Sequence, residues 1–460
     1  MVRFPSWGCI SMSVISKLSM LGAAGSGGEA YFINISYSNS GSWNIYPIET
    51  YRQGIVENSD GIIAAQNRLS ANNNSRVLLT MLNPSGEVTQ SLQLDENPSG
   101  ILDTDPFGIV SEGGFFYNSV YINDSNGKIH TILLKINTSG TVVWQVIEEA
   151  SGGGHRPTCS AVSGTDLIQA GASRNTGSSY DNGWIAKYTN SGSRTFVKLF
   201  RNGTVDWGVR SVDVDSSGNI ITASVGYAWT GGVNVSGEGQ VSIDKFNSSG
   251  THQSQITFGA AYTDQPISVR TDASNNIYVV WVSQGGGGFS SGYYLTKLNS
   301  SLSPQWTKYF GSGVTVRDIT VDSNEDIIAT IYDGTAIFVK IDSSGSIVFQ
   351  RELRAFNGAK NFRALSINTT ANDDIIFSGD TNAYGQSGIH VTKVRGDGSG
   401  LGTFGDYVYQ NYTGISLSNI TLSVGNNGFS TVNPSINIDS SPSLAVSTAP
   451  QVQYTSPVSL

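Results

Sequence analysis

Two groups of carboxylates have the residue types that bind calcium. Asp322 and Asp326 enclose a run of polar side chains, and Asp213 and Asp215 form a second pair. Ca²⁺ prefers oxygen donors of this kind, but neither group has the glycine and distal glutamate of an EF-hand loop. Calcium therefore stays an alternative, and the sequence favours hairpin turns at both places.

Other chemistry-bearing residues form no catalytic pattern. The histidines lie in different repeats and outside any motif, and we predict ordinary surface or strand positions for His130, His155, His252 and His390. No nucleophile elbow, HExxH helix, phosphate-binding loop or dinucleotide fingerprint occurs. Cys9 and Cys159 are far apart and form neither a disulfide framework nor a zinc site. The sequence predicts no catalytic residue, cofactor or metal, and we expect that the protein is not an enzyme.

Basic residues recur at equivalent places along the chain. A ring of binding sites is one interpretation of Lys135, Lys187, Lys245, Lys297, Lys340 and Lys393. The alternative, which we favour, is that each lysine stem packs along a sheet. Arg210, Arg317 and Arg363 recur on segments expected to be innermost. They either line a channel or pair with acids that link neighbouring repeats, and we favour the pairing.

A repeat of about fifty residues positions these side chains. Eight times a β-type segment enters a small turn and leaves it again, most clearly at 133–140, 185–192 and 242–250. Within 209–258, alternating residues and Gly/Asn/Asp/Ser turns indicate four short antiparallel strands. Four such strands, copied around a chain without helical periodicity, describe a β-propeller blade.

The hairpins determine the expected number of blades. Seven inner turns fall at 58–61, 111–114, 164–166, 215–219, 272–276, 322–326 and 372–374. The sequence thus predicts an all-β, seven-bladed antiparallel β-propeller with extended N- and C-terminal arms. Eight blades are the alternative, if 415–424 and 429–438 form another inner hairpin. An additional outer hairpin at 31–46 either clasps the last blade and closes the ring, or lies outside it.

We expect three segments. Residues 1–30 form an N-terminal arm, 31–410 the propeller with its clasp hairpin, and 411–460 an extended Ser/Thr/Asn-rich segment. This last segment contains no Lys or Arg and one acid, Asp439. Its short extended pieces cannot form a core alone, so they either pair with strand edges of this or an adjacent chain or stay flexible.

The two faces of the ring are expected to differ. The hairpin turns share one face and are short, whereas the opposite face carries longer individual loops at 174–183, 226–240, 284–294 and 380–388. Loops on a repeating scaffold are where binding usually resides. Contact with a ligand or partner is predicted for Tyr227, Trp229, Phe289 and Tyr293, with simple bridging of the strands as the alternative.

Composition limits the partners. Charged residues make up 13 % of the chain, about half the usual ~25 %. The net charge of −9 argues against a nucleic-acid ligand, because phosphate binding needs Lys and Arg. No apolar run approaches the ~20 residues that span a bilayer. Lys17 interrupts the apolar stretch near the N-terminus, which disfavours a cleaved signal.

Three sequence patterns resemble known families. The Lys-x-Asn/Asp-x-Ser-Gly turns and the segment 215–220, over about 45–410, resemble propeller repeats of bacterial and phage surface proteins. Residues 16–28 and the C-terminal segment ending at 448–450 resemble virion structural proteins of tailed phages, especially those of marine bacteria. The spacing of Gly140 and Trp144 resembles the blade-docking pattern of quinoprotein propellers, but it is complete only there, and no adjacent-cysteine pair occurs.

The phage resemblance implies a structural component of the virion, located in the tail. A nozzle, a tail-tip ring or a fibre-attachment subunit would fit, with other virion proteins and further copies of the chain in a symmetric assembly as partners. The alternative is a receptor-binding propeller on a phage fibre or bacterial surface, with a host surface glycan as its ligand.

Overall fold

The structure is a computed structural model. It describes residues 11–20, 30–38, 44–47, 54–71, 74–95, 101–124, 129–149, 155–174, 181–201, 207–230, 233–259, 264–286, 289–355, 362–381, 388–404, 407–422, 424–425, 430–432, 437–439, 445–448 and 452–454. Every element in these ranges is a β-strand. Within them, no helix is long and apolar enough to cross a membrane.

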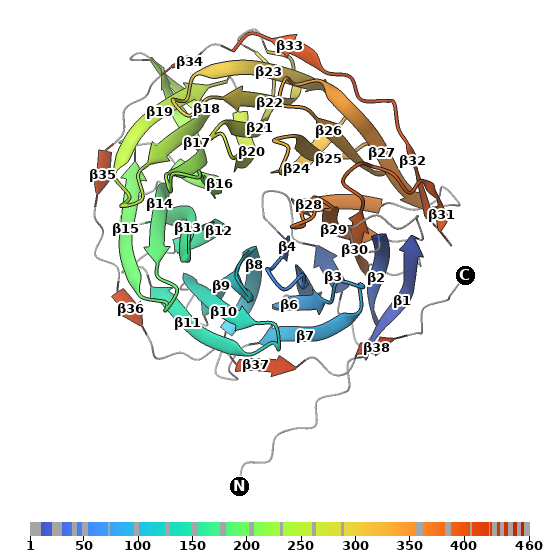
Figure 1. Cartoon of the computed structure of the whole chain (residues 1–460). Coiled ribbons are helices and arrows are strands. Elements are labelled where there is room, and N and C mark those ends of the chain that lie inside the picture. The colour runs from blue at the N-terminus through green and yellow to red at the C-terminus, as the bar shows by residue number, and fades with distance from the viewer. Residues whose placement is uncertain are drawn as a thin grey trace.

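The strands form seven sheets arranged radially around a central axis (Figure 1). The prediction of a seven-bladed antiparallel β-propeller is therefore confirmed. Each predicted inner turn connects the first strand of a blade to the second. The eight-bladed alternative is wrong, because the pieces within 415–438 join existing sheets as additional outer strands.

The first four blades follow one another along the chain. Blade 1 contains β3 (Asn44–Pro47), β4 (Ile55–Glu57), β5 (Ile63–Ala71), β6 (Asn74–Leu82) and β7 (Val88–Asp95). Blade 2 contains β8 (Ile101–Glu112), β9 (Phe115–Asp124), β10 (Ile129–Asn137) and β11 (Val142–Glu149). Blade 3 contains β12 (His155–Ser163), β13 (Asp166–Arg174), β14 (Asp181–Tyr188) and β15 (Arg194–Arg201). Blade 4 contains β16 (Trp207–Val214), β17 (Ile220–Thr230), β18 (Val233–Phe246) and β19 (His252–Phe258).

The remaining blades complete the ring. Blade 5 contains β20 (Asp264–Thr271), β21 (Ile277–Ser283), β22 (Gly292–Leu298) and β23 (Pro304–Gly311). Blade 6 contains β24 (Thr315–Val321), β25 (Ile327–Tyr332), β26 (Ala336–Ile341) and β27 (Ile347–Ala355). Blade 7 combines β28 (Phe362–Thr369), β29 (Ile375–Thr381) and β30 (Gly388–Val394) with two N-terminal strands, β1 (Ser11–Met20) and β2 (Ala30–Ser38).

The N-terminal strands close the ring. β2 pairs antiparallel with β30, and β1 pairs with β2. The clasp therefore consists of β1 and β2, and β1 lies within the segment expected to be an arm. The predicted hairpin partner of β2 goes elsewhere: β3 pairs with β5 in blade 1. Together β3 and β4 form the broken innermost strand of that blade.

A belt formed by the C-terminal segment surrounds the ring. After β31 (Gly402–Phe404), its strands are β32 (Tyr407–Asn411), β33 (Ser418–Ile420), β34 (Val424–Gly425), β35 (Ser430–Val432), β36 (Asn437–Asp439), β37 (Ala445–Thr448) and β38 (Val452–Tyr454). They pair in turn with the outer strands of blades 6, 5, 4, 3, 2, 1 and 7, opposite to the order of the blades in the chain (Figure 1). Of the two alternatives expected for this segment, which has no core of its own, the described strands thus show edge pairing within the chain.

Apolar cores lie between blades. One cluster joins blades 5 and 6, with Tyr278 and Val280 opposite Ile327 and Ile337. Alternate residues of a strand face opposite neighbours, so each sheet contributes to two interfaces. The belt covers the outer ends of some of these cores, because Ile415 packs into the cluster between blades 5 and 6.

Candidate functional site

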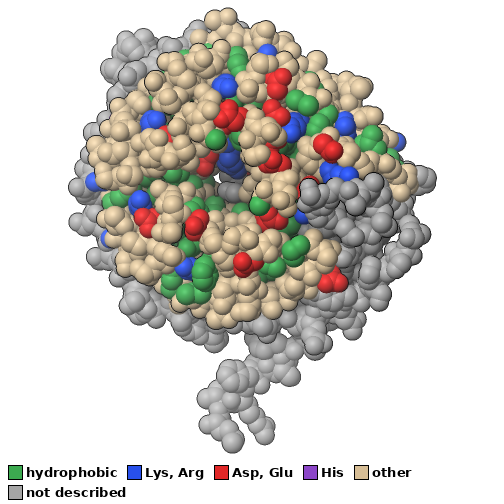
Figure 2. Space-filling model, viewed as in Figure 1, with side chains coloured by type: hydrophobic (Ala, Val, Ile, Leu, Met, Phe, Trp, Pro, Cys, Tyr) green, Lys and Arg blue, Asp and Glu red, His purple; other side chains and the backbone are tan. Residues whose placement is uncertain are grey.

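The axis of the propeller is the candidate site. The innermost strands surround a cavity of about 380 Å³ near the face that carries the inner turns. Glu57, Asp213 and Arg270 contribute charged side chains to its wall. Figure 2 shows acidic and basic side chains around the central opening.

A recurring irregularity shapes the wall. In blades 2 to 7 the ladder between the first and second strands shifts register at one level. Such bulges bend a strand and redirect its side chains. The residues that follow the shift are Gly108, Cys159, Ser211, Ser268, Asp318 and Ser366.

The polar members of this set tie neighbouring blades together. Ser211 Oγ accepts a hydrogen bond from the backbone N–H of Val269, at 3.0 Å. Ser366 Oγ accepts one from the N–H of Gly54, at 2.8 Å, which links blade 7 to blade 1. A short side chain at the bulge can thus reach the next blade's backbone.

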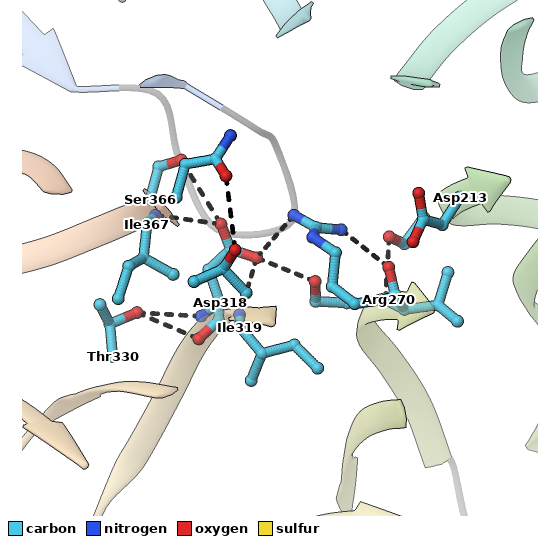
Figure 3. A network of polar contacts seen from close by, with 12 residues as sticks. Asp213, Arg270, Asp318, Ile319, Thr330, Ser366 and Ile367 are labelled. Atoms are coloured by element: carbon cyan, nitrogen blue, oxygen red, sulfur yellow. Dashed lines mark hydrogen bonds and ion pairs between the residues drawn. The ribbon is translucent and has the colours of Figure 1, made fainter. Parts of the chain in front are cut away.

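Asp318 is the hub of this ring (Figure 3). Its Oδ1 accepts hydrogen bonds from Ser268 Oγ at 2.8 Å and from its neighbour's backbone N–H, that of Ile319, at 2.9 Å. Its Oδ2 accepts one from the N–H of Ile367, at 3.2 Å. Burial raises the pKa of Asp318, whereas Arg270 and these donors lower it. The carboxylate therefore connects blades 5, 6 and 7.

Arg270 lies between two acids (Figure 3). Its Nη2 is 3.3 Å from Asp318 Oδ1, and its Nη1 donates to the carbonyl oxygen of Val269 at 2.8 Å. On the other side, Asp213 Oδ2 accepts from the backbone N–H of Thr271 at 2.7 Å. Burial raises the pKa of Asp213, and the nearby Arg270 charge lowers it.

Hydrogen bonds also connect neighbouring blades at two positions closer to the inner turns. The Ser111 hydroxyl donates to the carbonyl oxygen of Glu57 at 2.6 Å, and the Thr271 hydroxyl donates to that of Val214 at 3.2 Å. At the turns themselves, the N–H of Ser216 donates to Asn275 Oδ1 at 2.8 Å. These bonds between neighbouring blades add to those of Asp213, Arg270 and Asp318 and brace the ring.

The recurring lysines also join blades. Ion pairs to acids beside the inner turns are formed by Lys187 with Asp166, Lys245 with Asp215, Lys340 with Asp322 and Lys393 with Asp374. Lys245 Nζ additionally donates to the carbonyl oxygen of Ser300 in blade 5, at 3.0 Å. Lys297 Nζ donates in the same way to Ser343 of blade 6, at 3.1 Å. Lys245 and Lys297 therefore fasten their sheets to an outer turn of the next blade, whereas each of the four ion pairs lies within one blade.

Two of the carboxylates considered for calcium, Asp215 and Asp322, act as turn caps, whereas Asp213 bonds to Thr271 of the next blade. Asp322 Oδ1 accepts from the N–H groups of Asn324 and Asp326, each at 3.0 Å. Asp215 Oδ1 accepts from the N–H of Asn219 at 2.8 Å. These bonds confirm the hairpin interpretation. Within the described ranges, no three His, Cys, Asp or Glu side chains gather where they could hold a metal ion.

For Arg363, the expected pairing with an acid that links neighbouring repeats is wrong. Arg363 Nε donates to Asp380 Oδ1 at 2.7 Å, but both residues belong to blade 7, so this pair does not link blades. Arg270, which the sequence pattern did not single out, links blades 5 and 6 through Asp318.

The predicted contact aromatics do not form one described surface. Tyr227 and Trp229 lie in β17, whose backbone extends through the expected loop and pairs with β18; their side chains lie outside the described part. Phe289 is 8 % exposed and packs edge-on against Trp281, with ring centroids 5.5 Å apart. Tyr293 is half-buried against the core between blades 5 and 6. The Phe289 ring is therefore part of an apolar core and is not exposed for contact with a ligand.

Comparisons with known proteins bear on the fold alone. No protein-family model matches the chain, and no curated protein matches it. A solved protein of unknown function from Bacteroides caccae is similar at 13 % identity and a TM-score of 0.40, with 63 % of this chain and 94 % of that chain covered. The Pan2 WD40 domain of Neurospora crassa is similar at 8 % identity and a TM-score of 0.43, with 77 % and 97 % covered.

Proposed function

We propose that this protein is a structural component of a tailed-phage virion, located in the tail, and not an enzyme. Its propeller acts as a rigid disc that positions neighbouring subunits in a symmetric assembly. The observation that carries the proposal is the repeated fastening of blade to blade. The hub at Asp318, the hydroxyl-to-carbonyl bonds and the lysine bridges all connect sheets that would otherwise rest on apolar contact alone.

The assignment to a phage rests on the sequence resemblance of residues 16–28 and of the C-terminal segment. The bracing of the channel supports a mechanical role, because Asp213, Arg270 and Asp318 bond to groups within the protein. The burial of Phe289 removes one of the aromatic residues on which glycan binding would depend. Other virion proteins and further copies of this chain are the partners we propose.

Immunogold labelling of purified phage particles tests the proposal. Antibodies raised against the recombinant chain should label the tail at one fixed position in negative-stain images. Antibodies pre-absorbed with the same recombinant chain are the control and should leave the particles unlabelled. Absence of the chain from particles, by labelling and by mass spectrometry, contradicts the proposal. A glycan array with the purified protein tests the receptor-binding alternative separately.

A further inference from the structure

Blade 4 carries a buried polar layer on the face it turns toward blade 3. Ile220 and Phe246 on this face pack with residues of blade 3. Thr222 and Ser224 follow Ile220 at alternate positions of β17, and Ser242 and Asp244 precede Phe246 in β18, so the same face carries all four. These four side chains are 0 % exposed.

The strand register makes these side chains neighbours. Thr222 lies opposite Asp244, and Ser224 lies opposite Ser242. Asp244 in turn lies opposite Gln255 of β19. Residues directly opposite on one face have Cβ atoms about 5 Å apart. Asp244 thus has oxygen-bearing side chains on both adjoining strands.

The other blades show that the fold does not require polar residues here. In blade 6 the corresponding pairs are Ala329 with Val339 and Ile331 with Ile337, all buried. At the position of Asp244 the other blades have Thr80, Leu134, Ala186, Thr296, Val339 and Thr392. Blade 4 alone has a carboxylate there. The adjoining pair, Ser224 and Ser242, is also smaller than its blade 6 equivalents, Ile331 and Ile337.

The protein itself satisfies only part of this layer. Ser242 Oγ donates to Asp244 Oδ2 at 3.0 Å, and Gln255 Nε2 donates to Ser242 Oγ at 3.0 Å. Buried oxygens without a hydrogen-bond partner are Thr222 Oγ1, Ser224 Oγ, Asp244 Oδ1 and Gln255 Oε1. Burying an ionised carboxylate is costly unless it is paired. The nearest basic group is His252, whose Nε2 lies 3.7 Å from Asp244 Oδ1.

We propose that this layer binds a small monovalent cation of the Na⁺ type between blades 3 and 4. Hard cations take carboxylate, hydroxyl and amide oxygens as ligands. Asp244, Thr222, Ser224 and Gln255 supply that donor set. Their single negative charge neutralises one monovalent ion, whereas a divalent ion would leave a net charge in a dry interior. Mg²⁺ fits poorly because it retains several waters.

Thermal unfolding in matched salts tests the site. The wild-type melting temperature should be a few degrees higher in NaCl than in choline chloride of equal ionic strength, because an ion that binds the native state stabilises it. Asp244→Asn should abolish that difference. Thr80→Val, at the same position in blade 1, is the control and should retain it.

Other outcomes overturn the assignment. Equal melting temperatures of the wild type in the two salts would mean that the layer holds water alone. A stabilising effect of CaCl₂ without one of NaCl would exclude a monovalent site. If stability does not depend on Na⁺ but is lost in His252→Gln, the protonated imidazole of His252, and not a metal ion, neutralises the Asp244 carboxylate. The comparison of wild-type melting temperatures in NaCl and choline chloride uses no variant. It therefore still tests the proposal if Asp244→Asn does not fold.

Discussion

At the residue scale, Asp318 is the side chain on which the axial network depends. It is 5 % exposed, and it accepts hydrogen bonds from blades 5 and 7 as well as from its own. Replacing it removes the anionic partner of Arg270 Nη2 and the acceptor of several buried donors. Removing one partner of a buried, hydrogen-bonded charge pair costs about 3–5 kcal/mol.

We therefore expect Asp318→Ala to lower the free energy of unfolding by about 3–5 kcal/mol in urea denaturation. Asp342→Ala is the control, because Asp342 only caps an outer turn by accepting from the N–H groups of Ser344 and Ser346. The loss should be clearly smaller for Asp342→Ala. Equal losses for both variants would show that Asp318 is an ordinary turn-level carboxylate and no hub.

His390 should make stability depend on pH. Its Nε2 lies 2.8 Å from the carbonyl oxygen of Arg363, which can only accept, so Nε2 carries the proton of the neutral ring. Burial lowers the pKa of His390 from 6.5 to about 4. The unfolded chain therefore binds the proton at higher pH than the folded one.

The stabilising contribution of His390 is fully present above pH 6.5 and is lost as pH falls toward 4. The loss amounts to about 3 kcal/mol over that window. The buried Asp213, Asp244 and Asp318 have raised pKa values and act in the opposite direction, so total stability alone is uninformative. The difference in unfolding free energy between the wild type and His390→Gln should shrink from pH 7 to pH 4. A constant difference would refute this assignment.

At the element scale, the side-chain amide of Gln350 binds the belt at Ile415, between its strands β32 and β33. Gln350 Nε2 donates to the carbonyl oxygen of Ile415 at 2.8 Å, and Gln350 Oε1 accepts from the N–H of Ile415 at 3.0 Å. The amide thereby replaces a strand in pairing the backbone of the belt. Ile415 is held over the core between blades 5 and 6.

Gln350→Ala should release this part of the belt without unfolding the blades. Limited proteolysis should cleave 412–422 several times faster than in the wild type, because local opening controls access. The matched control is Gln305→Ala, since the Gln305 amide donates only to the carbonyl oxygen of Ser303, two residues away. Unchanged cleavage in Gln350→Ala would mean that strand pairing alone holds the belt.

Turn residues made the blades predictable. Inner turns require a left-handed residue, and Gly61 and Gly218 supply it with φ of 73° and 79°. Asn275 and Asp373 take the same place with φ of 63° and 61°. Gly, Asn and Asp adopt this conformation at little cost, so their spacing along the sequence marks each hairpin. The seven-bladed fold followed from that local chemistry.

The belt and the axial hub were not predictable to the same degree. Belt strands pair through the backbone, which carries no sequence code for one edge over another, so an eighth blade remained a reasonable alternative. Asp318 lies in an alternating strand and has no neighbour in sequence that reveals its contacts. The sequence did contain a signal. Ser211, Ser268, Asp318 and Ser366 each lie four residues before the residue whose N–H closes the inner turn, and these turn residues are Asp215, Asp272, Asp322 and Thr370. The side chain at this position reaches the next blade because of the β-bulge before it, and the bulge cannot be recognised from the sequence.

At the scale of the whole molecule, the first two and the last described strands of the chain meet in blade 7. β2 supplies the fourth strand of this blade, β1 the fifth, and β38 pairs parallel with β1. The clasp therefore also anchors the end of the belt. Loss of the clasp would expose the edge of β30 and leave the last belt strand without its partner. Unpaired edges of this kind promote association between chains.

Deleting residues 1–46 should consequently yield insoluble or non-cooperatively melting protein, because it removes β1, β2 and the β3 segment of blade 1. Deleting only residues 1–10 is the matched control and should preserve a single sharp transition, since β1 begins at Ser11. Solubility, circular dichroism and calorimetry of both truncations provide the measurement. If the longer truncation stays soluble and melts in one transition, five complete blades and the remaining strands of blades 1 and 7 suffice for closure. The bonds between innermost strands, such as Gly54 N–H to Ser366 Oγ, would then hold the ring without the clasp.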